Sequence, residues 1–184
     1  MTEKFSEYKW VNFVPDVVFH MRERDDSIGG DNPFRWVRKT TLDLFAGKKV
    51  LIFGLPGAFT PTCTNEQLPT FERMYDEFKE FGIEEIWCTS VNDAFAMYQW
   101  AQQLGIKNVK MLPDGNGDFA KGMGMLVDKS NLGFGKRSWR YAALINGLVI
   151  EKLWEEDGFT DNCPADPYDE SRPENVYSAL SSTG

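Results

Sequence analysis

The chain has 184 residues, of which 42% are hydrophobic and 14% aromatic, so it can bury one sizeable core, and we expect a single domain over residues 1–184. Its net charge of -8 argues against nucleic acid or an anionic membrane surface as a partner. No apolar run approaches the ~20 residues of a membrane-spanning helix, and the first ten residues are too polar for a signal peptide, so we expect a cytoplasmic location.

The cysteines and the histidine limit the kinds of site that the chain can build. Cys63, Cys88 and Cys163 stand far apart without a C-x-x-C motif, and their odd number leaves at least one thiol unpaired. The missing motif argues against a dithiol disulfide oxidoreductase. His20 is the only histidine, so no spacing suits a zinc site. We expect no metal and no cofactor, and a structural role for His20.

The first half of the chain predicts strands that alternate with a helix. A polar, turn-rich segment over residues 23–34 separates two short strand candidates. Continuous apolar runs predict buried strands, and apolar residues at spacings of three and four predict a helix that ends at Gly82. Cys88 lies inside one of these runs, and we expect it to be a small buried hydrophobe. The expected strands cover residues 17–21, 34–39, 49–55 and 84–91, and the helix covers residues 68–81.

The second half continues the alternation and adds a hairpin. The dipeptide Asn146-Gly147 between two apolar runs predicts a two-residue turn of type I′. Strands and helices in this order indicate an α/β sandwich, in which helices cover both faces of a mixed sheet. The expected helices cover residues 94–104, 119–125 and 173–182, and the strands cover residues 109–112, 141–145 and 148–154.

The junction between the strand at residues 49–55 and the following helix is suited to a reactive thiol. Backbone N–H groups are unpaired there and the helix dipole favours negative charge, so a thiol is pushed toward its thiolate. Cys63 occupies this position. A helix terminus supplies only about 0.3–1 kcal/mol, so an active thiolate also needs hydrogen-bond donors and a cation.

Candidate donors lie before Cys63 and in a later basic stretch. Thr60 comes one turn earlier and offers its hydroxyl, and the stretch GKRSWRY offers Lys136, Arg137 and Arg140. An arginine suits the task because its guanidinium stays charged and its fork can hold a thiolate and a second acceptor together. Composition leaves open which of the basic groups points inward, although Arg140 directly precedes the apolar hairpin.

The segment PGAFTPTC, from Pro56 to Cys63, resembles the active-site segment of the peroxiredoxin family, with the pattern P-x-x-x-T-x-x-C complete. The segments SVND, PDGNG and GFGKRSWRY are similar to the type II, or peroxiredoxin-5-like, subfamily, which includes bacterial peroxiredoxin-glutaredoxin fusions. The resemblance covers roughly residues 10–183. It implies a thioredoxin-like fold and a thiol peroxidase that reduces hydrogen peroxide and organic hydroperoxides.

The resemblance also implies a role for each matching residue. Cys63 resembles the peroxidatic cysteine, which attacks the terminal peroxide oxygen and becomes a sulfenic acid. Thr60 resembles the hydroxyl that binds peroxide and thiolate, Pro56 the residue that shields the site, and Arg140 the activating arginine. Glu66, three residues after Cys63, is expected either to orient Arg140 by an ion pair or to be an ordinary acid in the first turn of a helix.

The recycling step is left open by the sequence. Some members of this subfamily close a disulfide to a second cysteine in a late loop, and Cys163 lies in such a loop, DGFTDNCPADPYDE. Its acidic setting predicts an exposed thiol that is a poor nucleophile. The alternative is a one-cysteine cycle run by glutathione with a separate glutaredoxin, or by a thioredoxin system.

The mode of action and the assembly are further expectations. The resemblance implies a homodimer through the face that bears the active-site loop. A competing interpretation is a thiol-based redox sensor or holdase, in which oxidation of Cys63 changes partner binding without repeated turnover.

Overall fold

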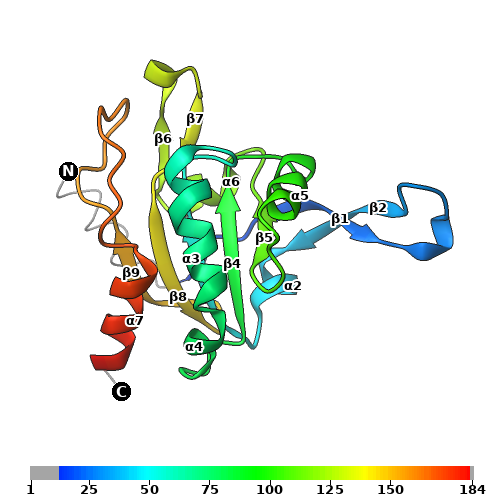
Figure 1. The fold of residues 1–184 in the computed structure, drawn as a ribbon, viewed down its shortest axis with the longest axis horizontal. Coiled ribbons are helices and arrows are strands. Elements are labelled where there is room, and N and C mark those ends of the chain that lie inside the picture. The colour runs from blue at the N-terminus through cyan, green and yellow to red at the C-terminus, as the bar shows by residue number, and fades with distance from the viewer. Residues whose placement is uncertain (1–12, 183–184) are drawn as a thin grey trace.

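A computed structural model describes residues 13–182 of the chain. Within this range the central sheet has five strands in the order β5-β4-β3-β8-β9 (Figure 1). Strands β3, β4 and β5 are parallel to one another. Strand β8 is antiparallel to β3, and β9 is antiparallel to β8. The mixed sheet that the sequence predicts is therefore confirmed. The strands are β3 (Lys49–Gly54), β4 (Glu85–Ser90), β5 (Lys110–Pro113), β8 (Tyr141–Asn146) and β9 (Val149–Glu155).

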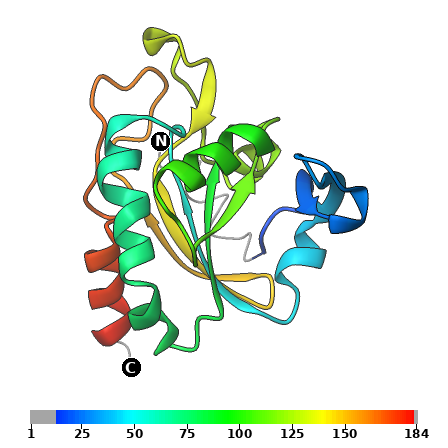
Figure 2. The same ribbon diagram turned by 45° about the vertical axis from the view of Figure 1, so that its right-hand side comes forward.

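Two hydrophobic clusters lie on the two faces of this sheet because successive side chains of a strand point to opposite sides. In β3, Leu51 and Phe53 belong to the first cluster, and Val50 and Ile52 belong to the second. Helices cover both faces, as expected for an α/β sandwich (Figures 1 and 2). The first face carries α3 (Leu68–Arg73), α4 (Tyr75–Lys79), α5 (Ala94–Gln103) and α7 (Pro173–Ser182), and the second carries α2 (Thr41–Phe45) and α6 (Asp118–Gly122).

Two small hairpins flank the central sheet. The first joins β1 (Val18–Arg24) and β2 (Phe34–Thr40) across the exposed turn that the sequence predicts, which contains the 3-10 turn η1 (Asp26–Ile28). The second joins β6 (Leu126–Asp128) and β7 (Lys136–Ser138) around η3 (Ser130–Leu132). The sequence does not predict the second hairpin, because three-residue strands are too short to show an alternating pattern.

Two local predictions need correction. The helix expected over residues 68–81 is divided at Met74 into α3 and α4, although Phe71 and Phe78 still pack in one cluster. The turn of the β8–β9 hairpin is Gly147-Leu148, because Asn146 pairs with Val149. Both turn residues have positive φ, 55° and 75°. Leu148 tolerates this strain because its side chain packs against the second cluster.

No helix in residues 13–182 is long and apolar enough to cross a bilayer. Cys88 is fully buried in β4, as predicted, and burial raises the pKa of its thiol well above the ordinary value.

Candidate active site

The segment between β3 and the next helix is held to the sheet by hydrogen bonds. Leu55 N–H donates to the carbonyl of Thr89 at 3.2 Å, and Ala58 N–H donates to Asn92 Oδ1 at 3.0 Å. Thr60 Oγ1 donates to the carbonyl of Gly57 at 2.7 Å, which closes a tight turn. These contacts fix the path of the chain just before Cys63.

Cys63 begins a π-helical turn, η2 (Cys63–Gln67), that leads into α3. The N–H of Leu68 donates to the carbonyl of Cys63, so the turn is one residue wider than an α-helical turn. Cys63 and Gln67 are fully buried, whereas Glu66 is exposed. The turn therefore directs Gln67, four residues after Cys63, toward the interior.

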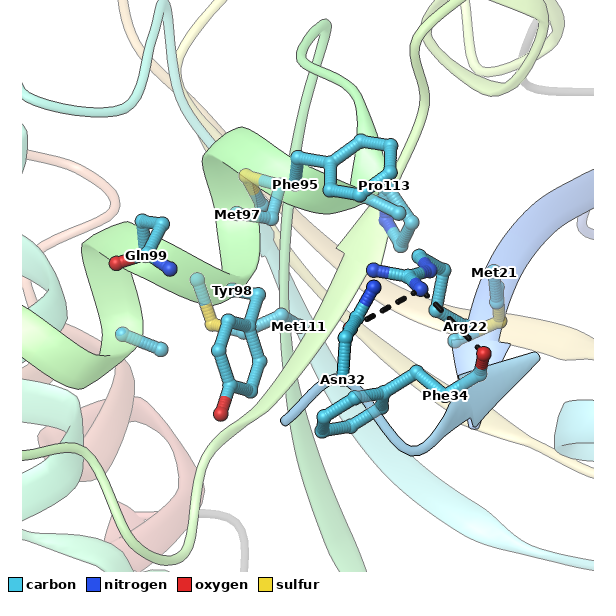
Figure 3. A pocket seen from close by; sticks show the side chains of 12 residues that line it. Met21, Arg22, Asn32, Phe34, Phe95, Met97, Tyr98, Gln99, Met111 and Pro113 are labelled. Atoms are coloured by element: carbon cyan, nitrogen blue, oxygen red, sulfur yellow. Dashed lines mark hydrogen bonds between the residues drawn. The ribbon is translucent and has the colours of Figure 1, made fainter. Parts of the chain in front are cut away.

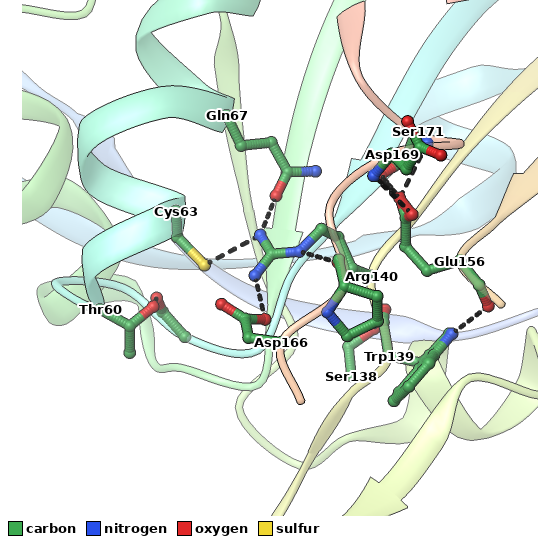
Figure 4. A network of polar contacts seen from close by, with 12 residues as sticks. Thr60, Cys63, Gln67, Ser138, Trp139, Arg140, Glu156, Asp166, Asp169 and Ser171 are labelled. Atoms are coloured by element: carbon green, nitrogen blue, oxygen red, sulfur yellow. Dashed lines mark hydrogen bonds and ion pairs between the residues drawn. The ribbon is translucent and has the colours of Figure 1, made fainter. Parts of the chain in front are cut away.

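Arg140 reaches the Cys63 sulfur from the residue before β8, the strand that pairs with β3. It lies just before β8, in phase with Ala142 of the first cluster, so its side chain points to the face that holds Cys63. It is 2% exposed, and its Nη1 donates to Cys63 Sγ at 3.4 Å (Figure 4). The sequence prediction that Arg140 accompanies Cys63 agrees with this geometry.

Three more groups hold the guanidinium of Arg140. Nη1 also donates to Gln67 Oε1, Nη2 forms an ion pair with Asp166 at 2.5 Å, and Nε donates to the carbonyl of Pro167 at 3.1 Å. Burial acts to lower the pKa of Arg140, but the Cys63 sulfur and the Asp166 carboxylate more than offset it and raise this pKa. The cation beside the sulfur is therefore permanent.

Glu66 does not orient Arg140, contrary to the ion pair considered from sequence. Gln67 takes that place, because the wide turn brings the fourth residue after Cys63, and not the third, to the buried side. Residues four positions apart lie on the same face of a helix, so the spacing between Cys63 and Gln67 could have identified Gln67 from the sequence. Asp166 and Pro167 carry no comparable signal, because they lie in a loop without periodicity.

The other candidate residues surround this centre. Pro56 is buried, and its carbonyl accepts a hydrogen bond from Arg137 Nη1 at 3.2 Å. Thr60 is half-buried and lies beside Cys63 in Figure 4. Burial lowers the pKa of Arg137, and the nearby Cys63 sulfur partly offsets this effect. Of the three basic residues of GKRSWRY, Lys136 is exposed, Arg137 is half-buried and Arg140 is buried.

Cys163 lies in a different environment from Cys63. All three cysteines of the chain are free thiols in the described range, and Cys163 is half-buried, not exposed as predicted, because it packs against the second cluster. Its neighbour Asn162 is bound to the β6–β7 hairpin, where its N–H donates to the carbonyl of Asp128 at 2.7 Å. Cys63 belongs to the first cluster, on the other face of the sheet.

A separate hollow of about 360 Å³ lies between the β1–β2 hairpin and α5. Its walls are mostly apolar, and Arg22 points into it beside Phe95 (Figure 3). Arg22 Cζ lies 4.6 Å from the centre of the Phe95 ring, and its Nη2 donates to Asn32 Oδ1 at 3.4 Å. The Phe95 ring thus forms a cation–π contact with the guanidinium of Arg22.

Comparisons with known proteins place this geometry in a family. The Redoxin family profile matches residues 37–161. A peroxiredoxin of Rhizobium etli is 59% identical over 167 residues, which cover 91% of this chain and 93% of the relative. A hybrid peroxiredoxin of Haemophilus influenzae is 45% identical over 155 residues, 84% of this chain and 59% of the relative.

A solved structure shows the same likeness in three dimensions. The Plasmodium falciparum antioxidant protein, a 1-Cys peroxiredoxin, has a TM-score of 0.86 and 36% identity, and the match covers 92% of this chain and 98% of that one. The share of this chain that the match covers, 92%, is close to the 91% covered by the Rhizobium etli relative, although the identity is lower. The chain therefore belongs to the peroxiredoxin family of thiol peroxidases.

Proposed function

We propose that Cys63 is the peroxidatic nucleophile and that Arg140 and Thr60 assist it. The observation that carries this proposal is the hydrogen bond of 3.4 Å from Arg140 Nη1 to the buried Cys63 Sγ. A buried thiolate is costly without a compensating charge, and a permanent cation at this distance supplies one. Cys88 lies in the same cluster, but burial raises the pKa of its thiol, so we assign it no part in the reaction.

The proposed step is a displacement at the terminal oxygen of a hydroperoxide. The Cys63 thiolate attacks this oxygen, an S–O bond forms, the O–O bond breaks, and the leaving oxygen takes a proton to become water or an alcohol. Arg140 stabilises the charge on the leaving oxygen, and the Thr60 hydroxyl does so once it has turned away from the carbonyl of Gly57. Pro56 shields the site from water. The product on the enzyme is the sulfenic acid of Cys63.

For the return step we propose a one-cysteine cycle, with glutathione and a separate glutaredoxin as the reductant. Two observations support it. Cys163 packs against the second cluster while Cys63 lies in the first, so a disulfide between them needs the Cys163 segment to leave the β6–β7 hairpin. The similar protein from Plasmodium falciparum is named a 1-Cys peroxiredoxin. The alternative is a two-cysteine cycle with Cys163 as the resolving cysteine and a thioredoxin system as the reductant.

We also propose a single domain over residues 1–184, a homodimer and a cytoplasmic location. The clusters on the two faces of the sheet draw on residues from Val14 to Leu180, which supports one domain. Phe59, just before the active-site helix, is about half exposed, which supports association at the face that bears the active-site turn. The location rests on the few cysteines.

Peroxide consumption by wild type, Cys63→Ser and Cys163→Ser tests this function. Each protein is assayed with glutathione plus glutaredoxin and separately with a thioredoxin system. We expect turnover to be lost in Cys63→Ser and kept in Cys163→Ser with glutathione plus glutaredoxin.

Other outcomes of the same assay have distinct meanings. Loss of turnover in Cys163→Ser with retained single-turnover oxidation makes Cys163 the resolving cysteine. Multiple turnovers in Cys63→Ser contradict the assignment of the nucleophile. A single oxidation of the wild type that no thiol reverses points instead to a redox sensor or holdase.

A further inference from the structure

The loop between β9 and α7, residues 156–172, surrounds the guanidinium of Arg140 with three consecutive residues. Asp166 forms the ion pair with Nη2, and the carbonyl of Pro167 accepts from Nε. The ring of Tyr168 lies 5.5 Å from Arg140 Cζ, within the range of a cation–π contact. The position of Arg140 therefore depends on the position of this loop.

The loop is itself fixed by the buried carboxylate of Glu156, which is 2% exposed. The N–H groups of Asp169, Glu170 and Ser171 donate to this carboxylate at 2.7, 2.9 and 2.9 Å. The Ser171 hydroxyl donates to it at 2.7 Å. A carboxylate that accepts several such bonds is held firmly, and the three donors directly follow the three residues that hold Arg140.

Glu156 also lies next to Arg140 along the chain backbone. The N–H of Glu156 donates to the carbonyl of Arg140 at 3.2 Å, and Glu156 O accepts from Trp139 Nε1 at 2.8 Å. Figure 4 shows these polar contacts, which extend from Cys63 through Arg140 to the loop, and those of the loop with Glu156. Glu156 thus binds the residues around Arg140 through its main chain, and its carboxylate binds the loop that covers the Arg140 side chain.

We propose that Glu156 is a positioning residue for peroxide reduction, which acts through residues 166–168 on the guanidinium of Arg140. The inference rests on the roles proposed for Cys63 and Arg140. When glutamine replaces Glu156, an amide NH2 takes the place of one of the two acceptor oxygens and faces N–H donors of the loop. The loop then moves, and Arg140 loses its anchors at Nη2, Nε and the Tyr168 ring. The Arg140 side chain then samples several rotamers, so its guanidinium spends less time beside the Cys63 sulfur and the interaction between them weakens.

Glu156→Gln tests this in the full-length chain, with Asp157→Asn as a matched control because Asp157 is the exposed neighbour. Alkylation by iodoacetamide is followed at the Cys63 peptide by mass spectrometry across pH, and hydrogen peroxide reduction is measured by stopped flow. We expect the alkylation midpoint of Glu156→Gln to move to higher pH and its rate constant for peroxide to fall about tenfold. Asp157→Asn should match wild type in both measurements.

A second variant separates positioning from a general structural effect. If Glu156 acts through the loop, adding Asp166→Ala to Glu156→Gln changes neither the midpoint nor the rate further, although Asp166→Ala alone changes both. Additive losses in the double variant contradict this route. If Glu156→Gln does not fold, as circular dichroism would show, Glu156→Asp replaces it, because the shorter carboxylate keeps its charge but cannot reach all three N–H groups.

Arg140→Ala distinguishes failure of this inference from failure of the proposed function. A higher alkylation midpoint in Arg140→Ala, together with a wild-type midpoint and rate in folded Glu156→Gln, overturns only the role of Glu156. An unchanged midpoint in Arg140→Ala overturns the role of the arginine, and the inference about Glu156 falls with it.

Discussion

Two buried thiols in one hydrophobic cluster differ in what surrounds them. Cys88 meets apolar neighbours, and burial raises the pKa of its thiol. Cys63 meets the guanidinium of Arg140 at 3.4 Å. Burying arginine is costly unless its donors are satisfied, and here Gln67, Asp166 and Pro167 all accept from it. The two thiols thus differ in that only Cys63 contacts a polar network within the core, which is the basis of the role that we propose for it.

Gln67 provides a test of this network at the residue scale. Gln67→Leu removes an acceptor of Arg140 while keeping a side chain of similar size, and a hydrogen bond to a charged group contributes about 1.5–3 kcal/mol. We expect the rate constant for peroxide reduction to fall about tenfold or more, measured by stopped flow. Glu66→Gln is the control, since Glu66 is exposed. Equal rates in both variants would contradict the role that the geometry gives to Gln67.

At the scale of elements, the register of β3 against β8 brings the two parts of the site together. Gly54, the last residue of β3, pairs with Tyr141, the first residue of β8. Cys63 lies nine residues beyond Gly54 and Arg140 lies directly before Tyr141, so both approach the same end of the sheet. A Cβ at Gly54 would lie 2.3 Å from Tyr141 Cε1, so this crossing requires glycine. Moving the register by one residue would turn Arg140 to the opposite face.

The turn from β5 into α6 contains a carboxyl group whose titration should affect stability. Asp114 is 4% exposed and accepts from the N–H groups of Phe119 and Ala120 at 2.9 and 2.8 Å. Burial raises its pKa to about 6. The folded protein therefore binds this proton more tightly than the unfolded chain does, so the free energy of unfolding should decrease as pH rises from about 4 to about 6, by up to about 3 kcal/mol.

Asp114→Asn isolates this contribution. We expect the variant to lose less stability than wild type between pH 4.5 and pH 7, measured by urea unfolding at both values, because asparagine does not ionise. Asp31→Asn, at an exposed position, should lose as much as wild type. A parallel pH dependence in Asp114→Asn and wild type would show that Asp114 keeps an ordinary pKa in the folded protein.

At the scale of the whole molecule, large aromatic side chains are exposed at the active-site turn and, separately, at the start of α5. Phe59 is 49% exposed, has a positive φ of 66°, and lies with its ring centre 6.4 Å from that of Trp100. Phe95 is 50% exposed and meets the ring of Trp36 edge to face. Aromatic side chains of this kind are enriched in protein interfaces, which fits the proposed homodimer.

Phe59→Ser tests this assembly. We expect the variant to sediment as a monomer at concentrations where the wild type sediments as a dimer, because the substitution removes a large apolar contact at the proposed interface. Leu42→Ser, at an equally exposed position on α2, should leave the sedimentation coefficient unchanged. A dimer of undiminished stability in Phe59→Ser would move the interface to another face.

Most of the strands and helices follow from the sequence, because apolar periodicity reports which residues are buried. The runs around β3, β4 and α7 have strong patterns, and their predicted positions agree with the structure to within one or two residues. The β6–β7 hairpin and the turn at Gly147-Leu148 escaped prediction, the first because its strands are short and the second because packing of Leu148 outweighs local turn preference.

The sequence by itself determined the family and the fold class, and it offered Cys63 and Arg140 as candidates, because contiguous motifs and apolar alternation are local properties of the chain. Only the tertiary structure decided that Gln67 replaces Glu66 beside the arginine, that residues 166–168 contact its guanidinium, and that Glu156 binds the residues that follow them. These contacts join residues up to 73 positions apart through a wide helical turn and an irregular loop. Such contacts are set by how strands and loops pack, and no local pattern records that packing.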